Sequence, residues 1–295
     1  MCTFSIIIPH KNTPHLLQRC LDSIPDISDV QVIVVDDNSQ SSVVDFDHFP
    51  GLERTYTEFV FDKEGGGAGH ARNIGLTLAK GRWVLFADSD DYFVPRFIDL
   101  LMPYTESENE VILFKIRSIY TDSMVATADF DNANHMIDDA LQNRISAAQA
   151  ILTIPGPVSK MFLREHLNKY HIKFDEIISS EDAMFVVKAV CWARCVAVSD
   201  SYVYTVTIRQ DSLSRRAIHD ATHFLCKMNV CIRRNKFYDE GGYPFPRRPI
   251  IVQVIRAAQF GLPTFWSALK MTISEGALFS GLSTLFVKLK KTIII

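Results

Sequence analysis

Cysteine is scarce in this sequence, and its six cysteines have neither the close pairing of a zinc site nor the density of a disulfide framework. Glycine and proline, at 13 and 12 of 295 residues, are too few for a collagen-like or low-complexity chain. Charge of one sign is also lacking: the net charge of −3 provides no positive field, so we expect no nucleic-acid partner. The 47% of hydrophobic residues suffices for a globular core, and we expect reduced thiols in a cytoplasmic setting.

Long apolar runs are missing as well. The two longest uncharged stretches near the C-terminus, Ala257–Leu269 and Gly276–Val287, fall short of the roughly 18 to 20 residues that cross a bilayer. The first residues carry neither a basic segment nor a cleavage pattern, so we expect no secretory signal. The sequence therefore predicts a protein without a membrane span.

The first hundred residues alternate short apolar runs with helical patterns. Phe4–Ile8 is a continuous apolar run, and Thr13-Pro14 supplies a cap and a first-turn proline for the helix that follows. This alternation predicts an α/β fold with a Rossmann-like, mostly parallel sheet flanked by helices. We expect strands at 4–8, 30–35, 55–61, 83–86, 111–120 and 196–205, helices at 14–24, 69–79, 180–193 and 217–231, and loops with a weak strand at 122–139.

Polar clusters follow the predicted strands. Asn12 follows the first strand, Asp36 and Asp37 follow the second, and residues 88–91 follow the fourth, while residues 65–73 form a glycine-rich turn that enters a helix. Ligands of parallel sheets bind outside the carboxyl ends of the strands. These four segments are therefore expected to converge on one edge and to form the site.

Asp88-Ser89-Asp90 follows a buried strand. Side chains two residues apart on an extended chain point the same way, so Asp88 and Asp90 can present two carboxylates to one point. Such oxygen donors suit Mg²⁺ or Mn²⁺ bridging to a diphosphate. The simpler alternative is an acidic turn that caps a helix beginning near Pro95.

Two further clusters favour nucleotide binding. Asp36 and Asp37 can accept hydrogen bonds from a base or a ribose, although an Asx turn also explains them. The turn at residues 65–69 lets the backbone approach a ligand closely, and Arg72 can contact a phosphate. The Glu181-Asp182 pair opens a helix, where a carboxylate serves either as a cap or as a general base for a sugar hydroxyl.

Several of these motifs occur together in the order and spacing of one enzyme family. They are Ile6-Ile7-Ile8-Pro9 with Asn12, Val34–Ser39, Ala71-Arg72-Asn73 with Gly75, Phe86–Asp91, Gly156–Phe162, Ser180-Glu181-Asp182, and Tyr204 with Arg209 and Ser212-Leu213-Ser214. Over about residues 3–215 the sequence resembles the family 2 glycosyltransferases, which have the GT-A fold.

The resemblance implies an inverting transfer from a nucleotide sugar, usually UDP-linked, with Asp182 as base and with Asp88 and Asp90 as metal ligands. The sequence departs from the family at Lys11, where many relatives have an aromatic residue, so a cationic contact replaces stacking on the base. The expected substrate- and nucleotide-binding residues are Pro9, Lys11, Asn12, Asp36, Asp37, Gly67, Arg72, Asn73, Asp88, Ser89, Glu181 and Arg209.

The C-terminal part of the chain differs in charge from the rest. Residues 244–295 hold seven basic residues and one acidic residue, a net charge of +6. An apolar stripe over residues 278–289 overlaps the cluster Lys288, Lys290 and Lys291, as in a helix that lies on an anionic membrane. Packing on the domain or a homodimer contact is the alternative. We expect a catalytic domain at 1–215 and a helical region at 216–295.

The resulting hypothesis is a hexosyl- or N-acetylhexosaminyltransferase that builds a bacterial surface polysaccharide, such as capsule or O-antigen. Its acceptor would be a saccharide or a polyprenyl-diphosphate-linked saccharide at the inner face of the cytoplasmic membrane. A sugar nucleotidyltransferase would need a basic N-terminal loop, and that loop has only Lys11. A non-catalytic nucleotide-sugar-binding protein could lose Asp182 or the Asp88/Asp90 pair, and all three are present.

Overall fold

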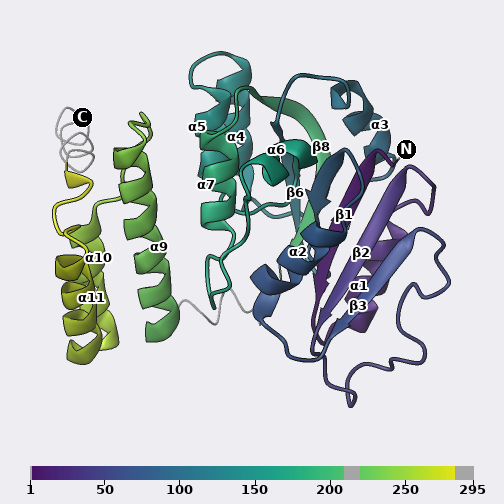
Figure 1. The fold of residues 1–295 in the computed structure, drawn as a ribbon, viewed down its shortest axis with the longest axis horizontal. Helices are drawn as coiled ribbons and strands as arrows, with labels where there is room; N and C mark the ends of the chain where they lie inside the picture. The colour runs from purple at the N-terminus through teal and green to yellow at the C-terminus, as the bar shows by residue number, and fades with distance from the viewer. Residues whose placement is uncertain (1, 209–219, 283–295) are drawn as a thin grey trace. The chain divides into compact units, whose positions relative to one another are not determined.

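The protein consists of two compact units. The computed structural model describes residues 2–208 and 220–282 (Figure 1). The described residues up to Glu176, together with Glu181 to Ile208, form the first unit. Ile177–Ser180 and residues 220–282 form the second. All described residues of the predicted site belong to the first unit.

An eight-stranded sheet forms the centre of the first unit, in the order β3-β2-β1-β4-β7-β6-β8-β5. The first four of these strands are parallel neighbours, as the alternating pattern predicts. In the other half, β7 is antiparallel to β4 and β6, β8 is parallel to β6, and β5 is antiparallel to β8. The strands are β1 (Phe4–His10), β2 (Val30–Asp37), β3 (Thr57–Asp62), β4 (Trp83–Phe86), β5 (Tyr92–Phe93), β6 (Val111–Tyr120), β7 (Lys160–Leu163) and β8 (Val196–Ile208).

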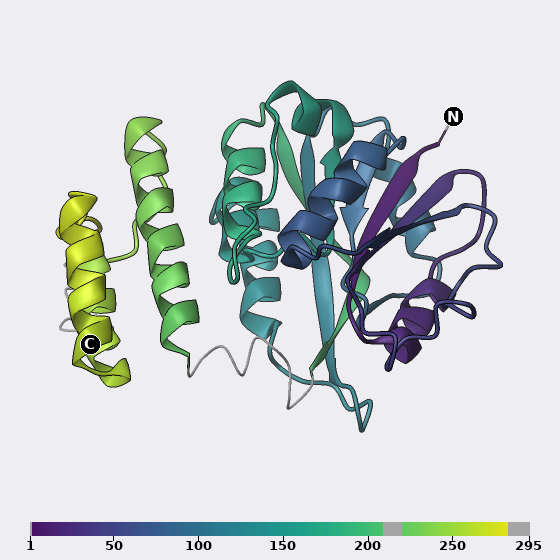
Figure 2. The same cartoon turned by 60° about the horizontal axis from the view of Figure 1, so that its bottom comes forward.

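Helices cover both faces of this sheet. One face carries α1 and α3, and the other carries α2, α4, α5 and α7, of which α4, α5 and α7 lie side by side (Figures 1 and 2). Crossover helices of this kind are what parallel strands require. The helices are α1 (Pro14–Asp22), α2 (Gly67–Leu78), α3 (Phe97–Leu101), α4 (Asp131–Leu141), α5 (Ala147–Thr153), α6 (Arg164–Lys169) and α7 (Ala183–Cys191).

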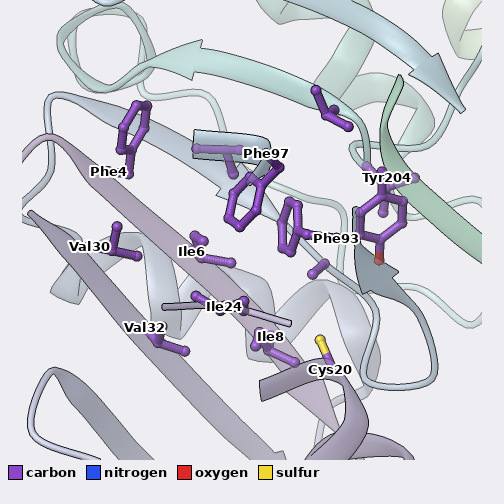
Figure 3. Close-up of a cluster of buried hydrophobic side chains, with 14 of the residues drawn as sticks. Phe4, Ile6, Ile8, Cys20, Ile24, Val30, Val32, Phe93, Phe97 and Tyr204 are labelled. Atoms are coloured by element: carbon purple, nitrogen blue, oxygen red, sulfur yellow. The ribbon is translucent and has the colours of Figure 1, made fainter. Parts of the chain in front are cut away.

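The continuous apolar runs of the parallel strands fill a core on each face. Ile6 and Ile8 of β1 pack in the core that contains Cys20 and Phe97 (Figure 3). Ile7, between them, points to the opposite face and packs in the core of α2 and α7. Because side chains alternate along a strand, both cores fix the position of β1 and of the loop after it.

Residues 131–141 form helix α4, so the predicted loops and weak strand were wrong there. The acidic composition conceals a helical spacing, in which Asn134, Ile137 and Ala140 are buried. Asn134 also hydrogen-bonds both backbone groups of Ile116, at 2.8 and 3.0 Å, beside an irregularity in the pairing of β6 with β8. The buried amide thus replaces ladder bonds at that point.

The second unit contains α9 (Ala221–Glu240), α10 (Ile250–Ala257) and α11 (Leu262–Ser274), which pack around a small apolar core. The expected amphipathic helix does not begin at Leu278, because the residues from Gly276 to Gly281 form turns. Gly281 has φ +78°, and a Cβ there would lie 2.5 Å from the Arg248 carbonyl oxygen. The rest of the predicted stripe, residues 283–295, lies outside the described residues.

Neither described stretch contains a helix that is long and apolar enough to cross a membrane. All six cysteines are free thiols, as their spacing predicts.

Candidate active site

Strands β1, β2 and β4 end side by side, and each end carries a polar segment. The register pairs His10 with Asp36 and Ile7 with Phe86, so the loops after these strands emerge at one edge. The glycine-rich turn before α2 comes to the same edge. The sheet therefore brings together the four segments that the sequence predicts.

Asp36 is a structural carboxylate in this arrangement. It is 2% exposed, and it accepts hydrogen bonds from the Ser39 hydroxyl at 2.6 Å and from His10 Nδ1 at 2.7 Å. His10 Nε2 accepts the Thr13 backbone N–H, which leaves the ring proton on Nδ1. Burial raises the pKa of Asp36, but these hydrogen bonds outweigh it and hold the pKa below its usual range.

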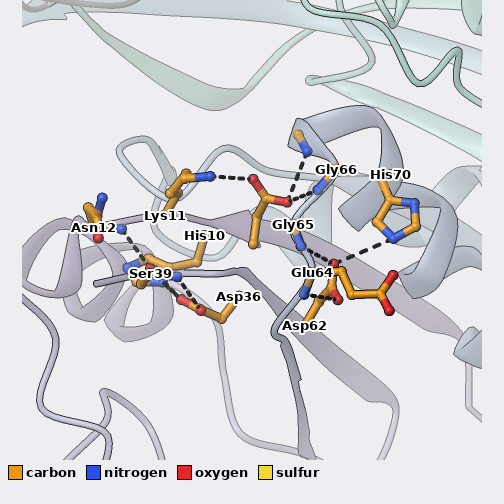
Figure 4. A network of polar contacts seen from close by, with 12 residues as sticks. His10, Lys11, Asn12, Asp36, Ser39, Asp62, Glu64, Gly65, Gly66 and His70 are labelled. Atoms are coloured by element: carbon orange, nitrogen blue, oxygen red, sulfur yellow. Dashed lines mark hydrogen bonds and ion pairs between the residues drawn. The ribbon is translucent and has the colours of Figure 1, made fainter. Parts of the chain in front are cut away.

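Asp37 binds the start of α2. One of its oxygens accepts the backbone N–H groups of Gly66 and Gly67, at 2.6 and 2.9 Å, and the other accepts Lys11 Nζ at 3.0 Å. Burial raises the pKa of Asp37, but the two N–H groups and Lys11 outweigh burial and hold the pKa below its usual range. The Lys11 side chain is 54% exposed and extends from the loop after β1 to this carboxylate (Figure 4).

The remaining residues of the first loop are fixed by local hydrogen bonds. Asn12 has φ +56°, donates its backbone N–H to Ser39 Oγ, and accepts the Gln40 N–H on its side-chain oxygen. Ser89 contacts Thr13 Oγ1 at 3.2 Å. Pro9, another expected binding residue, lies buried within β1 and pairs with Val35.

Arg72 joins two acidic segments that are far apart in sequence. Its Nη2 donates to Asp88 at 2.7 Å and its Nη1 donates to Glu181 at 3.0 Å, while its guanidinium lies over the Phe174 ring. Arg72 is only 5% exposed. Burial lowers its pKa, but Asp88 and Glu181 outweigh burial and raise the pKa above the ordinary value. One guanidinium thus connects the loop after β4 with the start of α7.

The loop after β4 is held by its backbone and by Asp91. The Asp90 carbonyl accepts hydrogen bonds from Arg19 and from the Thr207 hydroxyl, and buried Asp91 accepts the Thr207 N–H at 2.7 Å. Burial, then the charges of Asp88 and Asp90, raise the pKa of Asp91 well above its usual range. Asp88 and Asp90 remain partly exposed.

These two carboxylates fit a divalent cation of one particular kind. Among the described residues no group of three or more His, Cys, Asp or Glu side chains is arranged to hold a metal ion. Two partly exposed carboxylates suit Mg²⁺ or Mn²⁺, because such ions complete their coordination with water and substrate phosphates. The donor set therefore matches a metal that arrives with a diphosphate.

Asp182 stands at the start of α7, and its environment suits a base. Burial raises its pKa to about 7, assisted by Glu181 and opposed by Arg72. Helix α2 packs closely against the segment that contains Asp175 and Glu181, and this requires glycine at position 69. A Cβ there would lie 2.2 Å from the Asp175 carbonyl oxygen and 3.2 Å from the Glu181 side chain. A general base works best with a pKa near the operating pH.

Two further expected binding residues form hydrogen bonds within the protein, and a third lies outside the described residues. The Asn73 amide donates to the Phe174 carbonyl and to Glu176, and its oxygen accepts the Phe174 N–H. Asn73 therefore anchors the segment before Glu181. Gly67 contributes its backbone N–H to Asp37, whereas Arg209 lies outside the described residues.

The structure adds residues that the sequence patterns did not single out. In the sequence, His10 follows an apolar run without any sign of its contact with Asp36. Arg19 is distant in sequence from the acidic loop that it binds. His70 bridges Asp62 and Glu176, at 3.5 and 3.1 Å. Lys160 is the charged first residue of an otherwise apolar strand, and this contrast is the sequence signal that could have identified it.

Comparison with known proteins supplies the family. The sequence model described as "Glycosyl transferase family 2" matches residues 5–170. A relative from Bacillus spizizenii, named poly(ribitol-phosphate) beta-glucosyltransferase, is 28% identical over 221 residues, which cover 70% of this chain. That stretch spans only 32% of the relative's own length.

Two solved structures share the fold. S. aureus TarS 1–349 in complex with UDP-GlcNAc has a TM-score of 0.61 at 24% identity, covering 79% of this chain and 66% of TarS 1–349. The mannosyltransferase PcManGT from Pyrobaculum calidifontis, in complex with GDP-Man and Mn²⁺, has a TM-score of 0.52 at 17% identity. It covers 96% of this chain and 82% of that one. The predicted GT-A fold is confirmed.

Proposed function

Because the chain belongs to glycosyltransferase family 2, we propose that it transfers a sugar, with inversion, from a UDP-sugar to a saccharide hydroxyl. The observation that carries this proposal is the Arg72 bridge. It brings the Asp88 segment, suited to a metal and a diphosphate, within one side chain of the Glu181-Asp182 pair. A leaving-group site and a base on neighbouring segments are what a single in-line displacement needs.

Each residue then has a role in the reaction. Asp182 accepts the proton of the attacking hydroxyl. Arg72 fixes the position of the segment that carries this base relative to the acidic loop after β4. Lys11 releases the Asp37 carboxylate, and both side chains then contact the nucleotide. A Mg²⁺ or Mn²⁺ ion held by Asp88 and Asp90 would neutralise charge on the departing UDP. The other nucleotide contacts in this proposal are Asn12, Gly67, Ser89, Glu181 and Arg209.

The UDP donor and the polysaccharide acceptor rest on the relatives. TarS is in complex with UDP-GlcNAc, and the B. spizizenii relative is named for poly(ribitol-phosphate). We assign catalysis to residues 1–215. The donor in this proposal carries a glucosyl or an N-acetylglucosaminyl group. The acceptor in this proposal is a bacterial surface polysaccharide or its polyprenyl-diphosphate-linked precursor.

The direct test is UDP release from a panel of UDP-sugars, with Mn²⁺, with Mg²⁺ and with EDTA. Water replaces the unidentified acceptor in this assay. Metal-dependent release from one donor is the expected result. If calorimetry shows UDP binding but no donor is turned over, with saccharide acceptors or without them, the protein is a binding module and the proposal fails.

The pH dependence of UDP release follows from Asp182. Its pKa of about 7 means that the carboxylate form, which is the active base, predominates only at higher pH. The turnover number is expected to rise through about pH 7 and to fall about tenfold per unit well below it. A rate profile between about pH 5.5 and about pH 8.5 measures this. A turnover number that stays flat across this range would contradict the assignment.

We also propose that the second unit brings the enzyme to the inner face of an anionic membrane. Helix α11 buries Thr264, Ala268 and Thr272 in the core of its unit. Its other side exposes Leu262, Trp266 and Ile273, each 60% or more, so the outward face is the more apolar one. Apolar and aromatic side chains on a unit rich in Lys and Arg are typical of interfacial binding.

Removal of residues 283–295 is expected to weaken binding to anionic vesicles at least about tenfold, because three lysines are lost. The shortened protein keeps Ser280, whose side chain and backbone accept hydrogen bonds from Asn235 and Ile250, so these contacts of the second unit are preserved. Sedimentation with anionic and with zwitterionic vesicles measures the difference. Equal sedimentation of both proteins with anionic vesicles would exclude a role of this segment in membrane binding.

A further inference from the structure

Lys160 is a buried cation that the proposed reaction does not use. It lies in β7, opposite Leu113 of β6, and is 1% exposed. The next two residues of the strand, Met161 and Phe162, are fully buried in the two cores. An ammonium group in such a place costs free energy, so its position calls for a compensating interaction.

The ammonium group is directed at the turn that lies against Asp182. Lys160 Nζ donates a hydrogen bond to the Gly156 carbonyl oxygen at 2.5 Å. Gly156 is close enough to Asp182 that a Cβ built on it would lie 3.7 Å from Asp182 Oδ2. The Gly156 turn is therefore in contact with Lys160 and close to the Asp182 carboxylate.

The charges around Asp182 come from several elements. Glu181 on its own segment and Asp88 after β4 are negative, while Arg72 of α2 and Lys160 of β7 are positive. Arg72 divides its hydrogen bonds between Asp88 and Glu181. Within the described part of the chain Lys160 forms no ion pair, so its charge is not neutralised by a carboxylate in direct contact.

Asp182 and Lys160 influence each other electrostatically. Burial lowers the pKa of Lys160, and the negative charge of Asp182 opposes that effect and favours the ammonium form. The same attraction favours the ionised form of Asp182.

We propose that Lys160 is a positioning residue for the base: it fixes the Gly156 turn against Asp182 and supplies the buried positive charge that keeps this carboxylate ionised. The role in turnover rests on the proposed function. The electrostatic role does not, and it can be measured without a substrate.

The test compares Lys160→Met, which removes charge and hydrogen bond, with Lys160→Gln, which keeps a hydrogen-bond donor. The matched control is Lys188→Met, a half-buried lysine on α7. Carboxyl ¹³C NMR titration, with Asp182→Asn to assign the signal, is expected to show the pKa of Asp182 raised by about one unit in both Lys160 variants. The control should be unchanged.

UDP-release kinetics provide the second readout. The turnover number of the Lys160 variants at neutral pH should fall about fivefold, with donor KM within about threefold and the acid limb moved to higher pH. A carboxyl titration identical to wild type in the folded Gln variant overturns the proposal, as does a turnover loss with an unmoved acid limb. Thermal unfolding identifies a variant that fails to fold, and then the Gln variant decides.

The two proposals fail in different ways. A wild-type protein that neither binds UDP by calorimetry nor releases it from any donor refutes the glycosyltransferase proposal alone. The NMR titration still decides the coupling between Lys160 and Asp182.

Discussion

Asp182→Asn is expected to lower UDP release about 10²- to 10⁴-fold, the usual contribution of a general base. Asparagine has the shape of aspartate and preserves the start of α7, yet its amide cannot take a proton from the attacking hydroxyl. The proposed donor contacts lie on other residues, so UDP affinity should stay within about threefold of wild type.

The experiment measures UDP release and, by calorimetry, UDP binding. Asp200→Asn, the same change at an exposed position of β8, is the control and should behave as wild type. Turnover by Asp182→Asn within a few-fold of wild type would remove Asp182 from the role of base.

Asp90→Ala is expected to abolish the metal dependence of UDP release and to lower the rate about a hundredfold or more. A divalent ion contributes several kcal/mol to stabilising charge on a leaving diphosphate, and each 1.36 kcal/mol is about tenfold in rate. Asp88 is not substituted in this test, because its removal would break the ion pair with Arg72.

Wild-type protein in EDTA should match this variant, and a Mn²⁺ titration should restore only the wild type. Asp122→Ala, at an exposed loop position, serves as the control. If EDTA and Asp90→Ala both leave the rate unchanged, Asp90 does not hold a catalytic metal.

The parallel half of the sheet and its site edge could be predicted from the sequence, since their signals are local. Apolar runs define β1, β2 and β4, and the polar residues that follow them must meet at one edge. Helix α4 was not predicted, because its acidic sequence favours a helix only weakly. The helix is stabilised by the tertiary packing of Asn134 and Ile137.

The partners of the site residues could not be predicted in the same way. Asp36 and Asp37 are equivalent in sequence, but His10 satisfies one and Lys11 with α2 satisfies the other. Lys160 and Asp182 come from different elements. Which groups face each other depends on packing between segments, and residue spacing does not record it.

The division of the sheet determines which substitutions in one half can affect the other. The parallel half carries both residues assigned to the metal and most of those assigned to the nucleotide, whereas Glu181, Asp182 and Lys160 follow residue 110. Arg72 links the two by hydrogen bonds from a single side chain. Substitutions in the later segments that preserve Glu181 therefore leave this link in place, whereas loss of either partner uncouples the start of α7 from the parallel half.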